Sequence, residues 1–165
     1  MNQRYADYFA LHAKCAAQNG SDMSWADAVA LFDEIKGLKS MEIEHNDDRC
    51  ADRCGLIQEL LEAQGVEHGL LMIEFPETHG WYMHFGAIGV LDTGQQVIFD
   101  PMTFDTPLTR EKWIEAWTQN PEFHVIDPKC MGFMSRKDIQ TSLENISKHA
   151  EAKSEQASEP EAAIT

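Results

Sequence analysis

An α+β fold is predicted by the order of two kinds of pattern along this chain of 165 residues. Up to Gly65, apolar side chains recur at the spacing of amphipathic helices. Between Gly69 and Asp100 the apolar residues instead form runs rich in β-branched and aromatic types, separated by turn residues. Helices that are segregated from strands in this way are typical of an antiparallel sheet with flanking N- and C-terminal helices.

Two helices are predicted in a helical N-terminal extension, residues 1–40. The first ends at Asn19-Gly20, and its apolar stripe consists of Tyr5, Tyr8, Phe9 and His12. The second begins at Ser24, which forms a capping-box pattern with Asp27. The apolar stripe of this second helix consists of Trp25, Ala28, Val29, Phe32 and Ile35.

A third helix is predicted from the N-capping residues Asn46-Asp47-Asp48 to Gln64, with Gly65 as its C-cap. Its apolar anchors are Ile57, Leu60 and Leu61. Three strands follow, over Gly69–Phe75, Trp81–Leu91 and Gln96–Asp100. The last two strands are joined by Asp92-Thr93-Gly94, which has the composition of a hairpin loop.

The rest of the chain is predicted to hold a helix over Pro107–Trp117, a short strand over Phe123–Ile126 and a helix from Ser135 to about His149. From Ala150 onward Ala, Glu, Ser and Pro dominate, so residues 150–165 are expected to form a disordered acidic tail. The sequence thus predicts a single domain over residues 1–149, with its core at 46–128.

The charge balance narrows the classes of partner. The 13 basic and 28 acidic residues give a formal net charge of −15, which argues against binding to nucleic acid or to anionic membranes. No apolar run is long enough to span a bilayer, and the N-terminus lacks a signal-peptide core. We therefore expect a cytoplasmic protein by default, and signal-independent export is left open. In the reducing cytosol, the four cysteines are expected to stay as thiols.

Cys50 follows three N-capping residues, so it is expected in the first turn of the third helix. Backbone N–H groups and the helix dipole favour the thiolate there, whereas Cys54 lies one turn further in. A nucleophile is therefore predicted at Cys50, and its own N–H is a natural oxyanion donor. The alternative is that both cysteines are small core residues on one helical face.

His84 and Asp100 are the predicted partners of such a nucleophile. If Asp92-Thr93-Gly94 is a three-residue loop with Gly94 in the left-handed conformation, Asp100 lies opposite Gly86 and shares a face with His84. A two-residue loop would send Asp100 to the other face. The alternatives are a histidine that only fills the core and an aspartate that only forms a turn, with Asp127 before Pro128 as a rival.

Zinc binding is the other function for which cysteine and histidine side chains are suited. The spacing of Cys50 and Cys54, with His45 and His84 nearby in sequence, lacks the paired short intervals of a zinc finger or ribbon. No glycine-rich phosphate loop is present either. The sequence therefore predicts no metal and no cofactor.

Three segments together resemble the protein glutaminase (protein-glutamine deamidase) family, over about residues 47–117. They are Cys50-Ala51-Asp52-Arg53, Trp81-Tyr82-Met83-His84, and the stretch from Val97 through Asp100-Pro101-Met102-Thr103-Phe104-Asp105-Thr106-Pro107 to Trp113. The resemblance implies a papain- and transglutaminase-like core in which the nucleophile helix packs on the antiparallel sheet. It implies Cys50 as nucleophile, His84 as general base and acid, Asp100 as the orienting carboxylate and a structural Arg53.

The implied reaction is hydrolysis of glutamine side-chain amides in a protein or peptide substrate, through a thioester on Cys50. Trp81 and Tyr82 are candidates for the wall of the substrate-binding slot. A transglutaminase-like acyl transferase or a cysteine peptidase is the alternative enzyme, since the same triad serves both. The alternative of another class is a non-catalytic protein that holds a basic partner on its acidic surface. No oligomeric state is predicted.

The tail provides the first test. A chain that ends near His149 is expected to keep its melting temperature, because residues 150–165 hold too few apolar groups to offset the entropy cost of ordering them. Thermal unfolding followed by circular dichroism measures this. A drop of several degrees would show that the tail docks on the domain.

Overall fold

The computed structural model describes residues 5–39, 50–74, 83–119 and 128–132. The chain divides into two compact units, Met1–Phe133 and Met134–Thr165, and every described residue belongs to the first. The predicted strand at 123–126, the helix at 135–149 and the tail at 150–165 lie outside the described residues.

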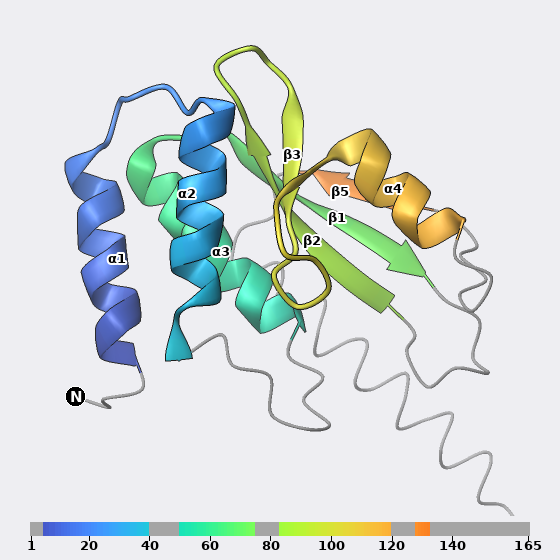
Figure 1. The fold of residues 1–165 in the computed structure, drawn as a ribbon, viewed down its shortest axis with the longest axis horizontal. Helices are drawn as coiled ribbons and strands as arrows, with labels where there is room; N and C mark the ends of the chain where they lie inside the picture. The colour runs from blue at the N-terminus through green and yellow to red at the C-terminus, as the bar shows by residue number, and fades with distance from the viewer. Residues whose placement is uncertain (1–4, 40–49, 75–82, 120–127, 133–165) are drawn as a thin grey trace, which may run out of the picture. The chain divides into compact units, whose positions relative to one another are not determined.

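Helices and strands do not alternate regularly along the described chain as they do in an α/β protein. The described elements therefore confirm a mixed α+β fold (Figure 1). In chain order they are α1 (Ala6–Ala17), α2 (Trp25–Lys36), α3 (Cys50–Gln64), β1 (His68–Glu74), β2 (Met83–Val90), β3 (Gln96–Phe99), β4 (Leu108–Thr109), α4 (Arg110–Thr118) and β5 (Pro128–Gly132). The strands form one five-stranded sheet in the order β4-β3-β2-β1-β5, and each pairing between them is antiparallel.

Helices cover both faces of the sheet, with α1, α2 and α3 on one side and α4 on the other (Figure 1). On the first face the space above Gly89 is filled by Leu61 of α3, and Phe32 of α2 stacks on Phe99 of β3 at 6.2 Å between ring centroids. On the second face a buried cluster joins the sheet to α4. Its members are Leu71, Ile73, Ile88, Ile98, Trp113 and Trp117.

The loop between β2 and β3 has the predicted form. Leu91 N–H donates to the Gln95 carbonyl at 2.9 Å, and Gly94 N–H donates to the Leu91 carbonyl at 2.9 Å. Gly94 has φ of 83°, the left-handed conformation that a three-residue loop requires. Ala87 then pairs with Phe99, so the next residues along the two strands, Gly86 and Asp100, face each other as predicted.

The helix stripes are confirmed in part. The predicted anchors of α3, Ile57, Leu60 and Leu61, are all buried, and Ser24 and Asp27 form the predicted capping box of α2. In α1, however, the buried residues are Tyr8, Leu11 and Cys15, and Phe9 is 55% exposed. Trp25 of α2 is 42% exposed. The prediction that both aromatic residues belong to a buried stripe was wrong. The apolar side of each helix is wider than the surface that its neighbours cover.

Two further boundaries differ from the sequence prediction. The helix predicted over Pro107–Trp117 begins only at Arg110, because Leu108 and Thr109 pair with β3 and the Thr109 hydroxyl caps α4 through Lys112 N–H. The sequence also missed β5, where Asp127-Pro128 suggested only a turn. Pro128 is tolerated there because it begins a strand at the edge of the sheet.

Within the described residues, no helix combines the length and the apolar character that crossing a bilayer requires.

Gly86 is expected to be intolerant of any side chain. A Cβ at this position would lie 2.4 Å from Cγ2 of Ile98 and 3.1 Å from Cζ2 of Trp113. Gly86→Ala should therefore lower the free energy of unfolding by about 1–3 kcal/mol through overpacking. Gly55→Ala is the matched control, since nothing outside its own helix backbone lies within 4 Å of that position. It should raise stability by about 0.5–1 kcal/mol. Equal effects in urea unfolding would contradict this packing.

Candidate active site

The candidate site forms where β2 extends beyond the end of β3. The ladder between these strands stops at Ala87 and Phe99, so the first part of β2, which carries His84, has the turn after β3 as its neighbour on that side. In this turn the N–H groups of Thr103 and Phe104 donate to the Asp100 carbonyl at 3.2 and 3.0 Å. The turn therefore fixes the backbone of Asp100 next to His84.

The side chains of His84 and Asp100 meet as the register predicts. His84 Nε2 lies 2.8 Å from Asp100 Oδ2, and the two residues are only 1% and 3% exposed. A carboxylate only accepts hydrogen bonds, so Nε2 carries the proton, and Nδ1 is the basic nitrogen of the neutral ring. This contact confirms the predicted geometry of the pair.

Aromatic residues of α4 enclose the pair from one side. The Trp117 ring lies 4.8 Å from the His84 ring and the Trp113 ring lies 6.2 Å from it, measured between centroids. The indole Nε1 of Trp113 donates to Asp100 Oδ2 at 2.9 Å. The Thr103 hydroxyl oxygen is 3.5 Å from His84 Nε2. On this side, the described residues around the pair are therefore mainly aromatic.

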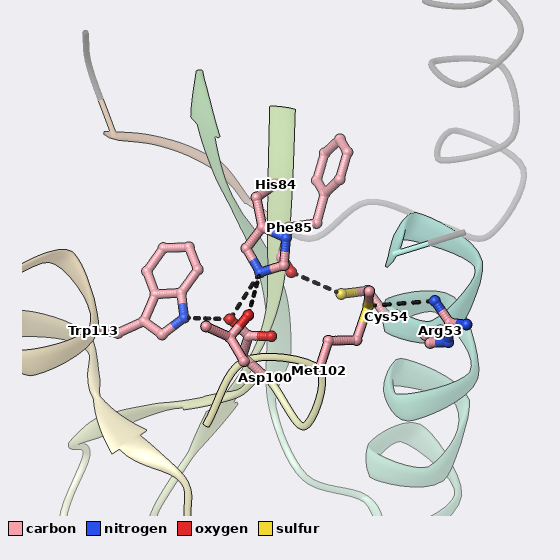
Figure 2. A network of polar contacts seen from close by, with 8 residues as sticks. Arg53, Cys54, His84, Phe85, Asp100, Met102 and Trp113 are labelled. Atoms are coloured by element: carbon pink, nitrogen blue, oxygen red, sulfur yellow. Dashed lines mark hydrogen bonds and ion pairs between the residues drawn. The ribbon is translucent and has the colours of Figure 1, made fainter. Parts of the chain in front are cut away.

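Helix α3 contacts the same place from the other side (Figure 2). The Cys54 thiol, only 4% exposed, donates to the carbonyl of Phe85, the residue after His84, at 3.3 Å. The buried Arg53 places Nη1 3.4 Å from Met102 Sδ, in the turn after Asp100. In Figure 2 the His84 nitrogen that does not face Asp100 lies on the side of the ring toward α3. The N-terminal part of α3 is thus tied both to the strand of His84 and to the turn of Asp100.

Cys50 is the first residue of α3, which agrees with its predicted place at the helix start. Cys54 follows one turn later, about 6 Å along the helix axis. The side chain of Cys50 lies outside what the structure describes, so its predicted approach to His84 stays a prediction. Trp81 and Tyr82, the predicted walls of the substrate slot, and the rival carboxylate Asp127 also lie outside the described residues.

No local pattern in the sequence indicates that Trp113 reaches Asp100. Trp113 belongs to the segments that resemble the protein glutaminases, and its spacing to Trp117 is that of any helix stripe. The signal that was available is Gly86, since a glycine two residues after a strand histidine leaves room for a large ring on that face.

Within the part of the chain that the structure describes, no three His, Cys, Asp or Glu side chains gather in a way that would hold a metal ion. Of the other histidines, His68 places Nδ1 3.0 Å from the Val66 carbonyl, and His12 packs beside Tyr8.

Cys15 and Cys54 are the two cysteines whose side chains the structure describes. Both are buried thiols outside any disulfide. Burial raises the pKa of the Cys15 thiol above its ordinary value, and the nearby Glu34 carboxylate adds to this shift. Cys54 is occupied as a donor to a carbonyl, a bond that the thiol makes and the thiolate does not.

Comparison with known proteins assigns no family. No protein-family model matches the chain, and neither the curated proteins nor the solved structures contain a significant match to it.

Thiol reactivity should separate these cysteines. Iodoacetamide at mildly acidic pH is expected to label Cys50 first, because a helix start favours the thiolate. Cys15 and Cys54 should react only after unfolding in urea, since both are buried. Peptide mapping by mass spectrometry after short exposure measures the order. Fast labelling of Cys54 in the folded protein would reverse the assignment.

Proposed function

We propose that this protein is a cysteine amidohydrolase that deamidates glutamine side chains of a protein or peptide substrate. The observation that carries the proposal is the buried hydrogen bond between His84 Nε2 and Asp100 Oδ2, beside a helix that begins with a cysteine. A buried imidazole whose tautomer is fixed by a carboxylate is what a nucleophilic cysteine needs as its base.

In the first half of the reaction, the Cys50 thiol gives its proton to His84 Nδ1 and the thiolate attacks the carboxamide carbon of glutamine. The tetrahedral oxyanion is stabilised by backbone N–H groups at the helix start, that of Cys50 among them. The C–N bond then breaks, His84 protonates the leaving nitrogen, and ammonia departs. A thioester joins Cys50 to the substrate.

In the second half, His84 Nδ1 accepts a proton from a water molecule that attacks the thioester carbon. The C–S bond breaks and the Cys50 sulfur takes the proton back from His84. The products are glutamate in the substrate, ammonia and the free enzyme. Asp100 accepts a hydrogen bond from Nε2 throughout, which keeps Nδ1 available for proton transfer and stabilises the imidazolium when it forms.

The electrostatic setting favours a reactive thiolate at Cys50. The first turn of α3 presents backbone N–H groups and the positive end of the helix dipole. Both favour the thiolate over the thiol, and only the thiolate attacks. Cys54, which donates its hydrogen to the Phe85 carbonyl, does not compete for this role.

The choice of substrate rests on the resemblance of Cys50, His84 and Asp100 and their flanking residues to protein glutaminases. Acyl transfer to an amine and cleavage of a peptide bond use the same three groups, and they are outcomes of the test below. A basic segment around the target glutamine would suit a chain with a net charge of −15.

Three variants test the proposal. Cys50→Ala and His84→Ala are expected to abolish ammonia release from glutamine-containing proteins. Asp100→Asn should reduce the rate by about 10- to 10³-fold, because the amide presents a donor where His84 needs an acceptor, yet a thiolate–imidazolium pair forms without the carboxylate. The measurements are ammonia release and the mass gain of deamidation in substrate peptides, with circular dichroism to confirm folding.

Cys54→Ser is the matched control, since it keeps a donor for the Phe85 carbonyl and leaves the nucleophile in place. It should retain most of the activity. Amine incorporation or peptide cleavage by the wild type would replace deamidation by one of the other reactions. A folded wild type with no turnover of any of these substrates would overturn the enzyme proposal.

A further inference from the structure

We propose that Trp113 is a positioning residue of this site: its indole N–H holds the carboxylate of Asp100 in the orientation that accepts the proton of His84 Nε2. This inference rests on the proposed function and extends it by a fourth residue. It starts from an arrangement in which one carboxylate oxygen, Asp100 Oδ2, receives both His84 Nε2 at 2.8 Å and Trp113 Nε1 at 2.9 Å.

Two donors on one oxygen restrict the carboxylate more than one donor does. With His84 alone, the plane of the carboxylate could turn about the Cβ–Cγ bond of Asp100 over a wider range of angles. The indole N–H comes from a different element, α4, and holds the accepting oxygen from a second direction. Trp113 is itself fully buried, and hydrogen bonds in such surroundings are stronger than in water.

The sheet is shaped to admit this indole. Gly86 lies two residues after His84 on the same face of β2, and a Cβ there would come within 3.1 Å of Cζ2 and 3.3 Å of Cε2 of Trp113. The ring therefore occupies the space that a side chain at position 86 would take. It reaches Asp100 because Asp100 directly follows Phe99, whose partner Ala87 directly follows Gly86.

Packing alone does not account for the arrangement. Phenylalanine would fill most of the same volume, and the cluster of α4 with the sheet already contains Trp117, whose ring contacts His84. A buried indole needs a partner for its N–H, but this partner is the one carboxylate that orients His84. The contact places a neutral donor on the charged oxygen and so limits how strongly that oxygen stabilises the imidazolium.

Two consequences follow for Trp113→Phe. The carboxylate loses its second anchor, so the turnover number should fall by about tenfold, the value of one hydrogen bond, while KM stays unchanged because no substrate contact is lost. Asp100 then accepts one hydrogen bond fewer, so its charge stabilises the imidazolium more strongly and His84 should hold its proton to higher pH. The acid limb of the pH–rate profile, where protonation of His84 removes the base, should move upward accordingly.

The experiment compares Trp113→Phe in two backgrounds. In the wild-type background it should lower kcat as stated. In the Asp100→Ala background it should have no further effect on kcat, because no carboxylate remains to be held. An equal loss in both backgrounds would show that Trp113 acts through packing and would overturn the inference, as would an unchanged kcat and pH profile in a folded Trp113→Phe protein.

A second measurement does not depend on turnover. In Cys50→Ala protein labelled with ¹⁵N-histidine, NMR reports the tautomer and titration of His84 with tryptophan or phenylalanine at position 113. The inference predicts a higher titration midpoint with phenylalanine, and an unshifted midpoint overturns it. Trp117→Phe, a ring change on the same helix that spares the bond to Asp100, should leave the Nε2–H tautomer in place.

If Trp113→Phe does not fold, β-(3-benzothienyl)alanine at position 113 replaces only the N–H by sulfur and keeps the shape of the ring. The same shift of the His84 titration is then expected, and its absence overturns the inference. If wild-type protein releases no ammonia, the proposed function fails, while the NMR comparison still decides the role of Trp113.

Discussion

The buried contact between His84 and Asp100 is the constraint around which this end of the molecule is arranged. A carboxylate that is removed from water is costly unless it is hydrogen-bonded. Asp100 meets this requirement with the imidazole of His84 and the indole of Trp113 on one oxygen. The early end of β3, the tight turn after it and the glycine opposite Asp100 all serve to bring these three groups together.

Both layers of helices contribute to this place although they lie on opposite faces of the sheet. Helix α4 supplies the aromatic wall, and α3 reaches the backbone of Phe85 and the turn residue Met102 with Cys54 and Arg53. The ladder between β2 and β3 ends at Ala87 and Phe99, so the strand of His84 and the turn of Asp100 are reached by residues from both layers. The approach of Cys50 to His84, which the proposed reaction requires, stays a prediction.

The N-terminal helices support the site indirectly. Phe32 of α2 stacks on Phe99, the residue directly before Asp100, so α2 backs the end of β3 from the far face. Lys36 of α2 also pairs with Asp105 in the loop that follows, which lowers the pKa of that carboxyl. Both partners of this ion pair are exposed, so it contributes little to stability compared with the buried ring contact.

What the sequence determined by itself is local. The capping box of α2, the end of α3 at Gly65 and the three-residue loop at Gly94 depend on neighbouring residues, and each was predictable. The pairing of His84 with Asp100 belongs here too, because strand alternation and one loop length fix it. The α+β fold class and the pairing of two of the three proposed catalytic residues, His84 and Asp100, follow from such rules.

Only the tertiary structure decided the rest. The outward faces of Phe9 and Trp25, the pairing of β5 with β1 and the bond from Trp113 to Asp100 depend on which distant segment packs where. An amphipathic pattern states that a helix has an apolar side, but not how wide a surface its neighbours will cover. The sequence of a helix likewise does not show which group will accept a hydrogen bond from one of its tryptophans. That acceptor belongs to another segment of the chain, and only the packing of the two segments brings it within reach.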